Sequence, residues 1–326
     1  MAGMMGSIRR RIITPDVSET KIETRGFHDK GPMGRRVLET VGESFLTGLG
    51  HAAETASPRL TGELLEELPT RYQGFAYEGA AMGFSLLDGL LPGGGRTRRF
   101  LEGPGADHVY MAYIGIGWAM ARLPRPLWPT TRNLDPVLRW LVHDGYGFHQ
   151  AYFHTDRYVR QGLRDDRAAR RTGDGPYALR AADQGVGRAL WFVGGTDPVR
   201  VADLVLTFDE ERHADLWSGV GLAATYAGGA DEEELRVLLD RAGGHRWEVA
   251  QGSAFAAEAR VRAGLLVPHT EAASQVLCGT DARQAALLSR NLRPDRHAGE
   301  GPERPAYEVW RTALAEEFSR REGARP

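Results

Sequence analysis

Residues 219–229 read GVGLAATYAGG, and residues 185–195 read GVGRALWFVGG. A Gly-x-Gly pair can belong to a dinucleotide-binding turn, which needs a preceding strand and a third glycine at a fixed offset. The segment before Gly219 is charged and typical of a helix, and the third glycine is replaced by Ala224 in one copy and Leu190 in the other. The pattern therefore argues against a Rossmann turn at both places.

The same pattern recurs along most of the chain. Glycine, any residue, then glycine or alanine opens six segments, at intervals of 41, 30, 40, 34 and 33 residues. Periods of this length are typical of helical repeat arrays. Glycine within a helix costs about 1 kcal/mol relative to alanine, so its recurrence indicates helices in close contact rather than phosphate binding. The six segments begin at Gly74, Gly115, Gly145, Gly185, Gly219 and Gly252. A polar residue precedes the glycine in five of them, as Gln73, Asp144, Gln184, Ser218 and Gln251.

Capping signals predict short helices between the glycine-bearing ones, over 198–207 and 231–242. Asp197 precedes a proline at the first helical turn, and Asp231 stands at capping-box spacing before a glutamate. Thr61 precedes an acidic first turn and an apolar pattern, which predicts another N-cap. We therefore expect an all-α fold, a single domain of tandem helical hairpins of the TPR or Sel1 kind, with a period of about 30–41 residues.

The array has predicted borders. Residues 1–30 lack helical periodicity and are expected to form an irregular N-terminal arm, and the helical repeat domain then spans 31–290. Residues 291–306 are rich in charge, glycine and proline, which predicts a flexible segment. Residues 307–326 are predicted to form a C-terminal capping helix and tail, since an end helix often closes a repeat array.

Composition narrows the class of protein. The 326 residues are 42% hydrophobic and carry a formal net charge of −2, so no basic field indicates binding to nucleic acid or to an anionic membrane. The single cysteine excludes a disulfide framework within the chain. The first residues lack the apolar core of a signal peptide, and the longest apolar run, within 109–121, is too short to span a bilayer. We expect a cytoplasmic protein without a membrane anchor.

Chemistry-bearing side chains concentrate in residues 144–158, DGYGFHQAYFHTDRY. His149 and His154 are five residues apart, about 140° around a straight helix, so they cannot share one metal there. The segment is either a buried aromatic helix with hydrogen-bonded histidines or part of a pocket in which His149 acts in acid–base chemistry. We predict no metal site, although a metal or redox site between His149 and Asp156 remains a third interpretation.

Glu78 and His149 are the candidate catalytic residues. Each stands four residues after a repeat glycine, Gly74 and Gly145, where the other four segments have alanine. A buried carboxyl group has a raised pKa, and a nearby histidine can exchange a proton with it. The alternative is a structural pair that ties two repeat units together. Candidate substrate-binding residues in the same groove are Tyr77, Asp144, Tyr152, His154, Trp191 and Tyr226.

Several familiar catalytic motifs are missing from the sequence. It contains no P-loop, no serine nucleophile elbow, no Cys–His signature, no aspartate-rich prenyl-diphosphate motif and no zinc helix with two histidines four residues apart. No motif identifies a cofactor, so the cofactor, if any, stays unknown at this stage.

Long segments of the sequence resemble domain of unknown function family 1702. They include RYQGFAYEGAAMGFSLLD, GPGADHVYMAYIGIGWAMARL, DGYGFHQAYFH, RHADLWSGVGLAATYAGG and PAYEVWR. The resemblance implies a role in enediyne natural-product biosynthesis, in which the protein acts on or binds the linear apolar polyene of an iterative polyketide synthase during core formation. It implies a hydrophobic polyene or polyyne as ligand and the synthase and other pathway proteins as partners. It assigns no catalytic residue. The alternative function is a non-catalytic helical-repeat scaffold that holds the synthase and its oxidative partner proteins.

Overall fold

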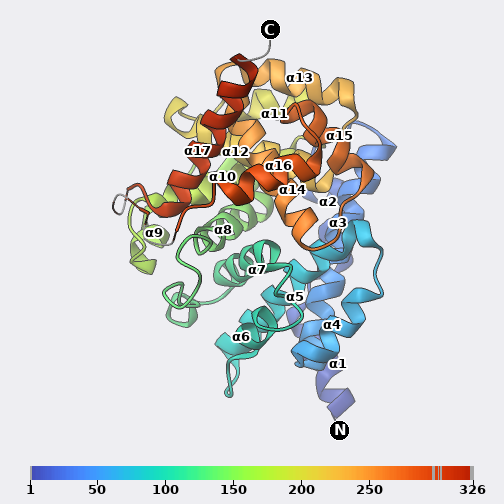
Figure 1. Ribbon diagram of the computed structural model, residues 1–326. Helices are drawn as coiled ribbons and strands as arrows, with labels where there is room; N and C mark the ends of the chain where they lie inside the picture. Colours follow the sequence, from blue (N-terminus) through green and yellow to red (C-terminus); the bar gives the residue numbers. More distant parts are fainter. Residues whose placement is uncertain (1, 296–297, 300, 302, 324–326) are drawn as a thin grey trace.

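The long glycine-bearing helices pack side by side in chain order (Figure 1). The computed structural model describes residues 2–295, 298–299, 301 and 303–323, and every regular element in them is helical. The sequence prediction of an all-α fold is therefore confirmed. The row consists of α3 (Pro32–Thr55), α5 (Thr70–Leu90), α7 (Val109–Arg122), α8 (Trp140–Phe153), α10 (Tyr177–Val193), α12 (Glu210–Ala227) and α14 (Arg246–Arg262). A shorter helix without glycine, α16 (Ala282–Asn291), packs on α14 at the end of the row.

Shorter helices form a second layer beside the later part of the row. α13 (Glu232–Ala242) packs between α11 (Pro198–Val205) and α15 (Pro268–Leu277). The two short helices predicted over 198–207 and 231–242 correspond to α11 and α13. Their N-caps are as predicted, because Asp197 accepts hydrogen bonds from two backbone N–H groups and Asp231 forms a full capping box. The connections of the earlier part hold α4 (Pro58–Glu66), α6 (Arg96–Leu101) and α9 (Asp166–Thr172).

In four of the long helices, α7, α8, α10 and α12, a Gly-x-Gly pair seats the helix against both of its neighbours. A Cβ atom on Gly185 would lie 1.8 Å from the carbonyl oxygen of Asp144 in α8. A Cβ atom on Gly187 would lie 2.1 Å from the carbonyl oxygen of Leu216 in α12. The pairs in α7, α8 and α12 make the same two approaches. The helices thus meet backbone to backbone, which confirms that these glycines have a packing role.

In α5 the glycine that packs on the preceding helix is Gly79 and not Gly74. A Cβ atom on Gly79 would lie 2.0 Å from the carbonyl oxygen of Phe45 in α3, whereas one on Gly74 would meet the Tyr226 hydroxyl at 1.9 Å. The interval of 41 residues, from Gly74 to Gly115, therefore starts at the wrong glycine. Both glycines are buried in one apolar helix, so spacing alone did not separate their roles.

This shift of register changes the position of Glu78. The carbonyl oxygen of Glu78 faces Gly115 of the next helix, just as that of Asp144 faces Gly185. Glu78 is thus the α5 counterpart of Asp144, and the predicted equivalence of Glu78 and His149 is wrong. Gln73 likewise does not belong to the set of polar residues that precede the repeat glycines, because the repeat glycine of α5 is Gly79.

The N-terminal segment is helical rather than irregular. α1 (Ala2–Ile13) packs on the C-terminal part of α3, where a Cβ atom on Gly6 would lie 2.6 Å from the carbonyl oxygen of Glu54. A further short helix, α2 (Ile22–Arg25), follows. The predicted arm over 1–30 is therefore corrected to two α-helices with a short 3-10 helix, Val17–Thr20, between them.

One smaller prediction also changes. The N-cap of α4 is Ser57, while Thr61 lies inside the helix, fully buried, with its hydroxyl 2.8 Å from that of Thr55. The predicted flexible segment 291–306 contains residues 296, 297, 300 and 302, which lie outside the described residues.

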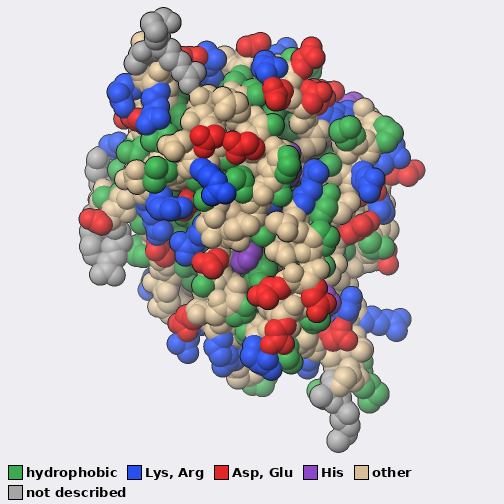
Figure 2. Space-filling view, turned by 45° about the vertical axis from the view of Figure 1, so that its right-hand side comes forward, with side chains coloured by type: hydrophobic (Ala, Val, Ile, Leu, Met, Phe, Trp, Pro, Cys, Tyr) green, Lys and Arg blue, Asp and Glu red, His purple; other side chains and the backbone are tan. Residues whose placement is uncertain are grey.

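The surface carries charges of both signs. On the face shown in Figure 2, basic and acidic side chains lie interspersed, without a large area of one sign. Within the described part of the chain, no helix combines the length and the apolar character that crossing a membrane requires.

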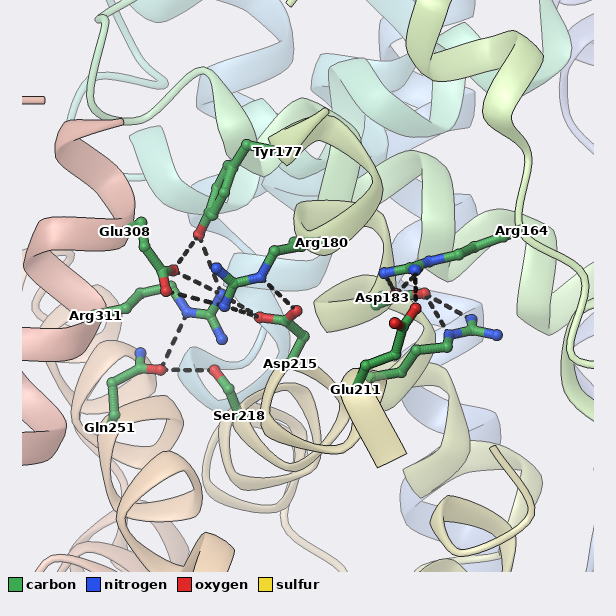
Figure 3. A network of polar contacts seen from close by, with 11 residues as sticks. Arg164, Tyr177, Arg180, Asp183, Glu211, Asp215, Ser218, Gln251, Glu308 and Arg311 are labelled. Atoms are coloured by element: carbon green, nitrogen blue, oxygen red, sulfur yellow. Dashed lines mark hydrogen bonds and ion pairs between the residues drawn. The ribbon is translucent and has the colours of Figure 1, made fainter. Parts of the chain in front are cut away.

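The last helix, α17 (Ala306–Gly323), matches the predicted C-terminal capping helix and packs on α14. In its apolar contact with α14, the centroid of the Trp310 ring lies 4.4 Å from the centroid of the Phe255 ring. Its polar contact is a buried network, drawn in Figure 3, in which Arg311 donates to Asp215 at 2.6 Å and to the Tyr177 hydroxyl at 3.1 Å. We call this network the capping cluster, and its members are Tyr177, Arg180, Asp215, Glu308 and Arg311.

Candidate functional site

The row of long helices curves around a pocket. α12 returns to contact α3, and the Tyr226 hydroxyl on α12 reaches Gly74 of α5. Six helices, α3, α5, α7, α8, α10 and α12, line the enclosed space of about 800 Å³, a volume that includes its open mouth. Most of the lining is apolar, with Phe45, Leu49, Phe75, Phe148, Phe192 and Leu222 among the walls.

Polar groups gather in the interior of this pocket, on five different helices. We call Glu78, Trp118, His149, Arg188 and Tyr226 the pocket floor. Their side chains are nearly inaccessible to solvent, with between 2% and 7% of each residue exposed. The close backbone contacts at the glycines fix the helices that carry them, so the floor is positioned by the same packing that builds the fold.

The Glu78 carboxyl group is held in its protonated form at neutral pH. Burial raises its pKa to about 8, because a charged carboxylate would lose its hydration. The Arg188 cation opposes this rise and the Asp144 anion adds to it. The ion pair of Arg188 is with Asp144 and not with Glu78, and the raised pKa lets the Glu78 carboxyl group act as an acid at neutral pH.

His149 is neutral in the same surroundings. Burial lowers the pKa of its imidazole to about 3, and the Arg122 cation acts in the same direction. The ring stands edge-on to the Trp118 indole, with 5.4 Å between centroids. Its Nδ1 atom has no hydrogen-bond partner, so a neutral imidazole nitrogen is available inside the pocket.

Asp144, which lies outside the pocket, holds the Arg188 side chain in place. The two side chains form a buried ion pair at 2.5 Å, and Gln184 donates a second hydrogen bond to Asp144 at 2.9 Å. The Arg188 guanidinium lies over the Phe148 ring, 4.9 Å from its centroid. Asp144 does not line the pocket, so its predicted role in substrate contact is corrected to positioning Arg188.

The N-terminal segment borders the pocket. Pro15, Glu19 and Thr20 contribute to its lining. Arg122 of α7, which is solvent-exposed, donates a hydrogen bond to the carbonyl oxygen of Ile13 at 3.1 Å and so ties this segment to the rim. The segment that the sequence suggested was an irregular arm therefore belongs to the site.

The structure brings together four of the predicted site residues. Glu78, His149, Tyr152 and Tyr226 all line this one pocket. The two candidate catalytic residues therefore share a cavity, although the equivalence used to select them is wrong. Burial raises the pKa of the Tyr152 hydroxyl above its usual range, so that hydroxyl stays protonated.

Besides Asp144, three further predicted substrate-binding residues lie outside the pocket. Tyr77 faces the other side of α5, where its ring stacks on His108 with 3.5 Å between centroids. Trp191 is a fully buried core residue that donates a hydrogen bond to the carbonyl oxygen of Gly228 at 3.0 Å. His154 is exposed just beyond the end of α8. These three assignments are corrected to structural or surface positions.

The third interpretation of the sequence was a metal or redox site between His149 and Asp156. Asp156 is exposed and paired with Arg160 at 2.7 Å. In the described part of the chain, no three side chains of the His, Cys, Asp or Glu type are grouped as metal ligands would be.

Arg188 was not among the residues that the sequence suggested. The signal was present, because Arg188 is the one charged residue in GVGRALWFVGG, the segment that begins at the repeat glycine Gly185. A cation in an apolar helix needs a buried partner. The partner, Asp144, lies one helix back in the row and 44 residues away in the chain, so only the fold reveals the pair.

Comparison with protein families identifies one match. The model of the family described as "Protein of unknown function (DUF1702)" covers residues 4–318. The comparison with curated proteins found no match, and the comparison with solved structures found none either.

Proposed function

The chain belongs to the DUF1702 family of proteins of unknown function, and we propose that it serves enediyne natural-product biosynthesis. Its ligand in this proposal is the linear apolar polyene or polyyne that an iterative polyketide synthase supplies, which the protein binds or transforms during core formation. The proposal places the protein in the cytoplasm, in contact with the synthase and other proteins of the pathway. It treats the row of hairpins as a repeat array of the TPR or Sel1 kind.

The observation that carries the proposal is the apolar pocket with its few ionisable groups. Aromatic and aliphatic walls from six helices suit an elongated hydrocarbon chain. Glu78 and His149 lie in the same pocket, which is the arrangement that proton transfer to or from a bound ligand requires.

The two ionisable groups have complementary protonation states. At neutral pH the Glu78 carboxyl carries a proton because its pKa is about 8, and the His149 imidazole lacks one because its pKa is about 3. Glu78 is thus the group that can give a proton to a ligand, and the unprotonated nitrogen of His149 can accept a hydrogen bond that orients the ligand for this step. Exclusion of water by the apolar walls protects a reactive polyene during this step.

The test is product formation in the producing host. Glu78→Gln and His149→Ala are each expected to abolish enediyne formation and to leave an upstream polyene or polyyne, while circular dichroism shows a folded protein. Tyr77→Phe is the matched control, since Tyr77 is buried outside the pocket. Undiminished product from both pocket variants would remove these residues from the mechanism and favour the scaffold function.

A further inference from the structure

We propose that the pocket floor binds a carbonyl oxygen at one end of the ligand, so that the apolar chain extends from the floor toward the mouth. This inference rests on the proposed function and specifies its ligand class. The ligand would be a conjugated polyene that ends in an aldehyde, ketone or ester carbonyl rather than a plain hydrocarbon.

The first observation is a set of buried polar atoms without partners. His149 Nδ1, Arg188 Nε and the Tyr226 hydroxyl have no hydrogen-bond partner, and all three residues line this pocket. They come from α8, α10 and α12, and the Trp118 indole of α7 beside them faces the Glu78 carboxyl group as a donor. Buried polar groups are nearly always hydrogen-bonded, because an unpaired one has lost its hydration without a replacement. Three such atoms in one cavity indicate a ligand that pairs with them.

The second observation is the hydrogen-bonding character of these atoms. A guanidinium Nε can only donate, and a tyrosine hydroxyl without a partner is free to donate. The protonated Glu78 carboxyl adds another donor, since its pKa is about 8. The floor therefore presents a surplus of donors, which fits an acceptor oxygen with two lone pairs.

The third observation concerns charge. The Arg188 cation is already neutralised by Asp144, while Glu78 and His149 are uncharged at neutral pH because their pKa values are about 8 and about 3. The other cation that lines the pocket, Arg122, lies at the exposed rim. The floor thus has no free positive charge, and a buried carboxylate there would lack a counter-ion. A neutral carbonyl group fits this balance better.

The experiment compares three probes of equal chain length, a linear tetraene aldehyde, the tetraene hydrocarbon and the tetraenoic acid. We expect the purified full chain at neutral pH to bind the aldehyde about tenfold more tightly than either of the others, as one or two net hydrogen bonds would provide. The absorption band of the bound aldehyde should move to longer wavelength, because hydrogen bonds polarise its carbonyl group.

Variants of single residues test which side chains produce the preference for the aldehyde. Tyr226→Phe and Glu78→Gln each should reduce the preference for the aldehyde severalfold and reverse part of the band shift, while the affinity for the hydrocarbon stays unchanged. Tyr110→Phe removes the same hydroxyl from a residue outside this pocket and should change neither quantity. Leu222→Trp fills the pocket and should abolish binding of all probes.

The outcomes separate the two proposals. Equal affinities for aldehyde and hydrocarbon, or tighter binding of the acid, would overturn the carbonyl inference and leave the proposed function standing. Failure of all three probes to bind, or binding that survives Leu222→Trp, would overturn both.

Discussion

The capping cluster and the pocket floor are both buried polar groups in an α-helical core, yet they differ in how fully their hydrogen bonds are satisfied. In the capping cluster, Asp215 accepts from both Arg180 and Arg311, and the Tyr177 hydroxyl donates to Glu308 at 2.7 Å (Figure 3). On the pocket floor, the side chains of His149, Arg188 and Tyr226 retain atoms without any partner.

This difference distinguishes a polar cluster with a structural role, the capping cluster, from one with a functional role, the pocket floor. A saturated network joins elements, and here it joins α17 to α10 and α12. An unsaturated one leaves a free-energy cost in the empty protein that a ligand can remove. Ion pairs alone do not distinguish them, because the Arg188–Asp144 pair beside the floor is as buried as the Arg311–Asp215 pair.

The largest effect is expected from removing the shared acceptor of the capping cluster. Asp215→Ala leaves the Arg311 and Arg180 cations without their main partner, one of them fully inside the protein, and should lower the free energy of unfolding by about 3–5 kcal/mol. Urea unfolding followed by circular dichroism measures this. Asp156→Ala, which breaks an exposed pair, should cost less than about 1 kcal/mol. Similar losses in the two variants would contradict a structural role for the cluster.

The next effect depends on pH and comes from the pocket floor. The folded-state pKa of Glu78 is raised from 4.5 to about 8, so between these pH values the folded chain binds more protons at this site than the unfolded chain. The stability of the parent protein therefore falls as pH rises through this window, by up to about 5 kcal/mol from this group. Glu78→Gln does not titrate and should gain stability relative to the parent over the same window.

Urea unfolding at a series of pH values from about 4 to 9 checks this linkage. The difference between Glu78→Gln and the parent should grow with rising pH and then level off above the folded-state pKa. Glu63→Gln changes an exposed glutamate of α4 and should give a nearly constant difference. A pH-independent difference for Glu78→Gln would show that Glu78 is ionised in the folded protein.

A third prediction concerns the packing that positions both clusters. Gly185→Ala places a Cβ atom 1.8 Å from a backbone carbonyl oxygen, so α8 and α10 must separate. We expect a loss of about 1–3 kcal/mol in the free energy of unfolding. Gly3→Ala, in α1 with nothing near its added Cβ, should be neutral or stabilise the protein by up to about 1 kcal/mol. A neutral Gly185→Ala would contradict backbone-to-backbone contact between the long helices.

The helical class and the packing role of glycine could be predicted because both depend on local rules. The capping box at Asp231 and the cost of glycine inside a helix act within a few residues or recur at a fixed period. Register within α5 could not be predicted, because Gly74 and Gly79 lie in the same apolar segment and only the partner helices distinguish them.

The candidate site was predictable in part, for a related reason. Glu78 and His149 stand out because ionisable side chains are rare in apolar helices. The direction in which a buried aromatic residue points depends on which face its helix buries, and helices buried on all sides give no such signal. Tyr226 and Tyr77 therefore looked alike in the sequence, although one lines the pocket and the other stacks on His108.

The smallest effect is expected from two matched tyrosines, one in each cluster. Tyr177→Phe removes a hydroxyl that donates to Glu308 and accepts from Arg311, and should lower the free energy of unfolding by about 1–3 kcal/mol. Tyr226→Phe removes a buried hydroxyl that has no partner, so the free energy of unfolding should stay unchanged or rise by about 1 kcal/mol. Parallel urea titrations measure both variants. If Tyr226→Phe were the more destabilising change, its hydroxyl would already be satisfied in the empty protein, and the pocket floor would be a structural cluster like the first.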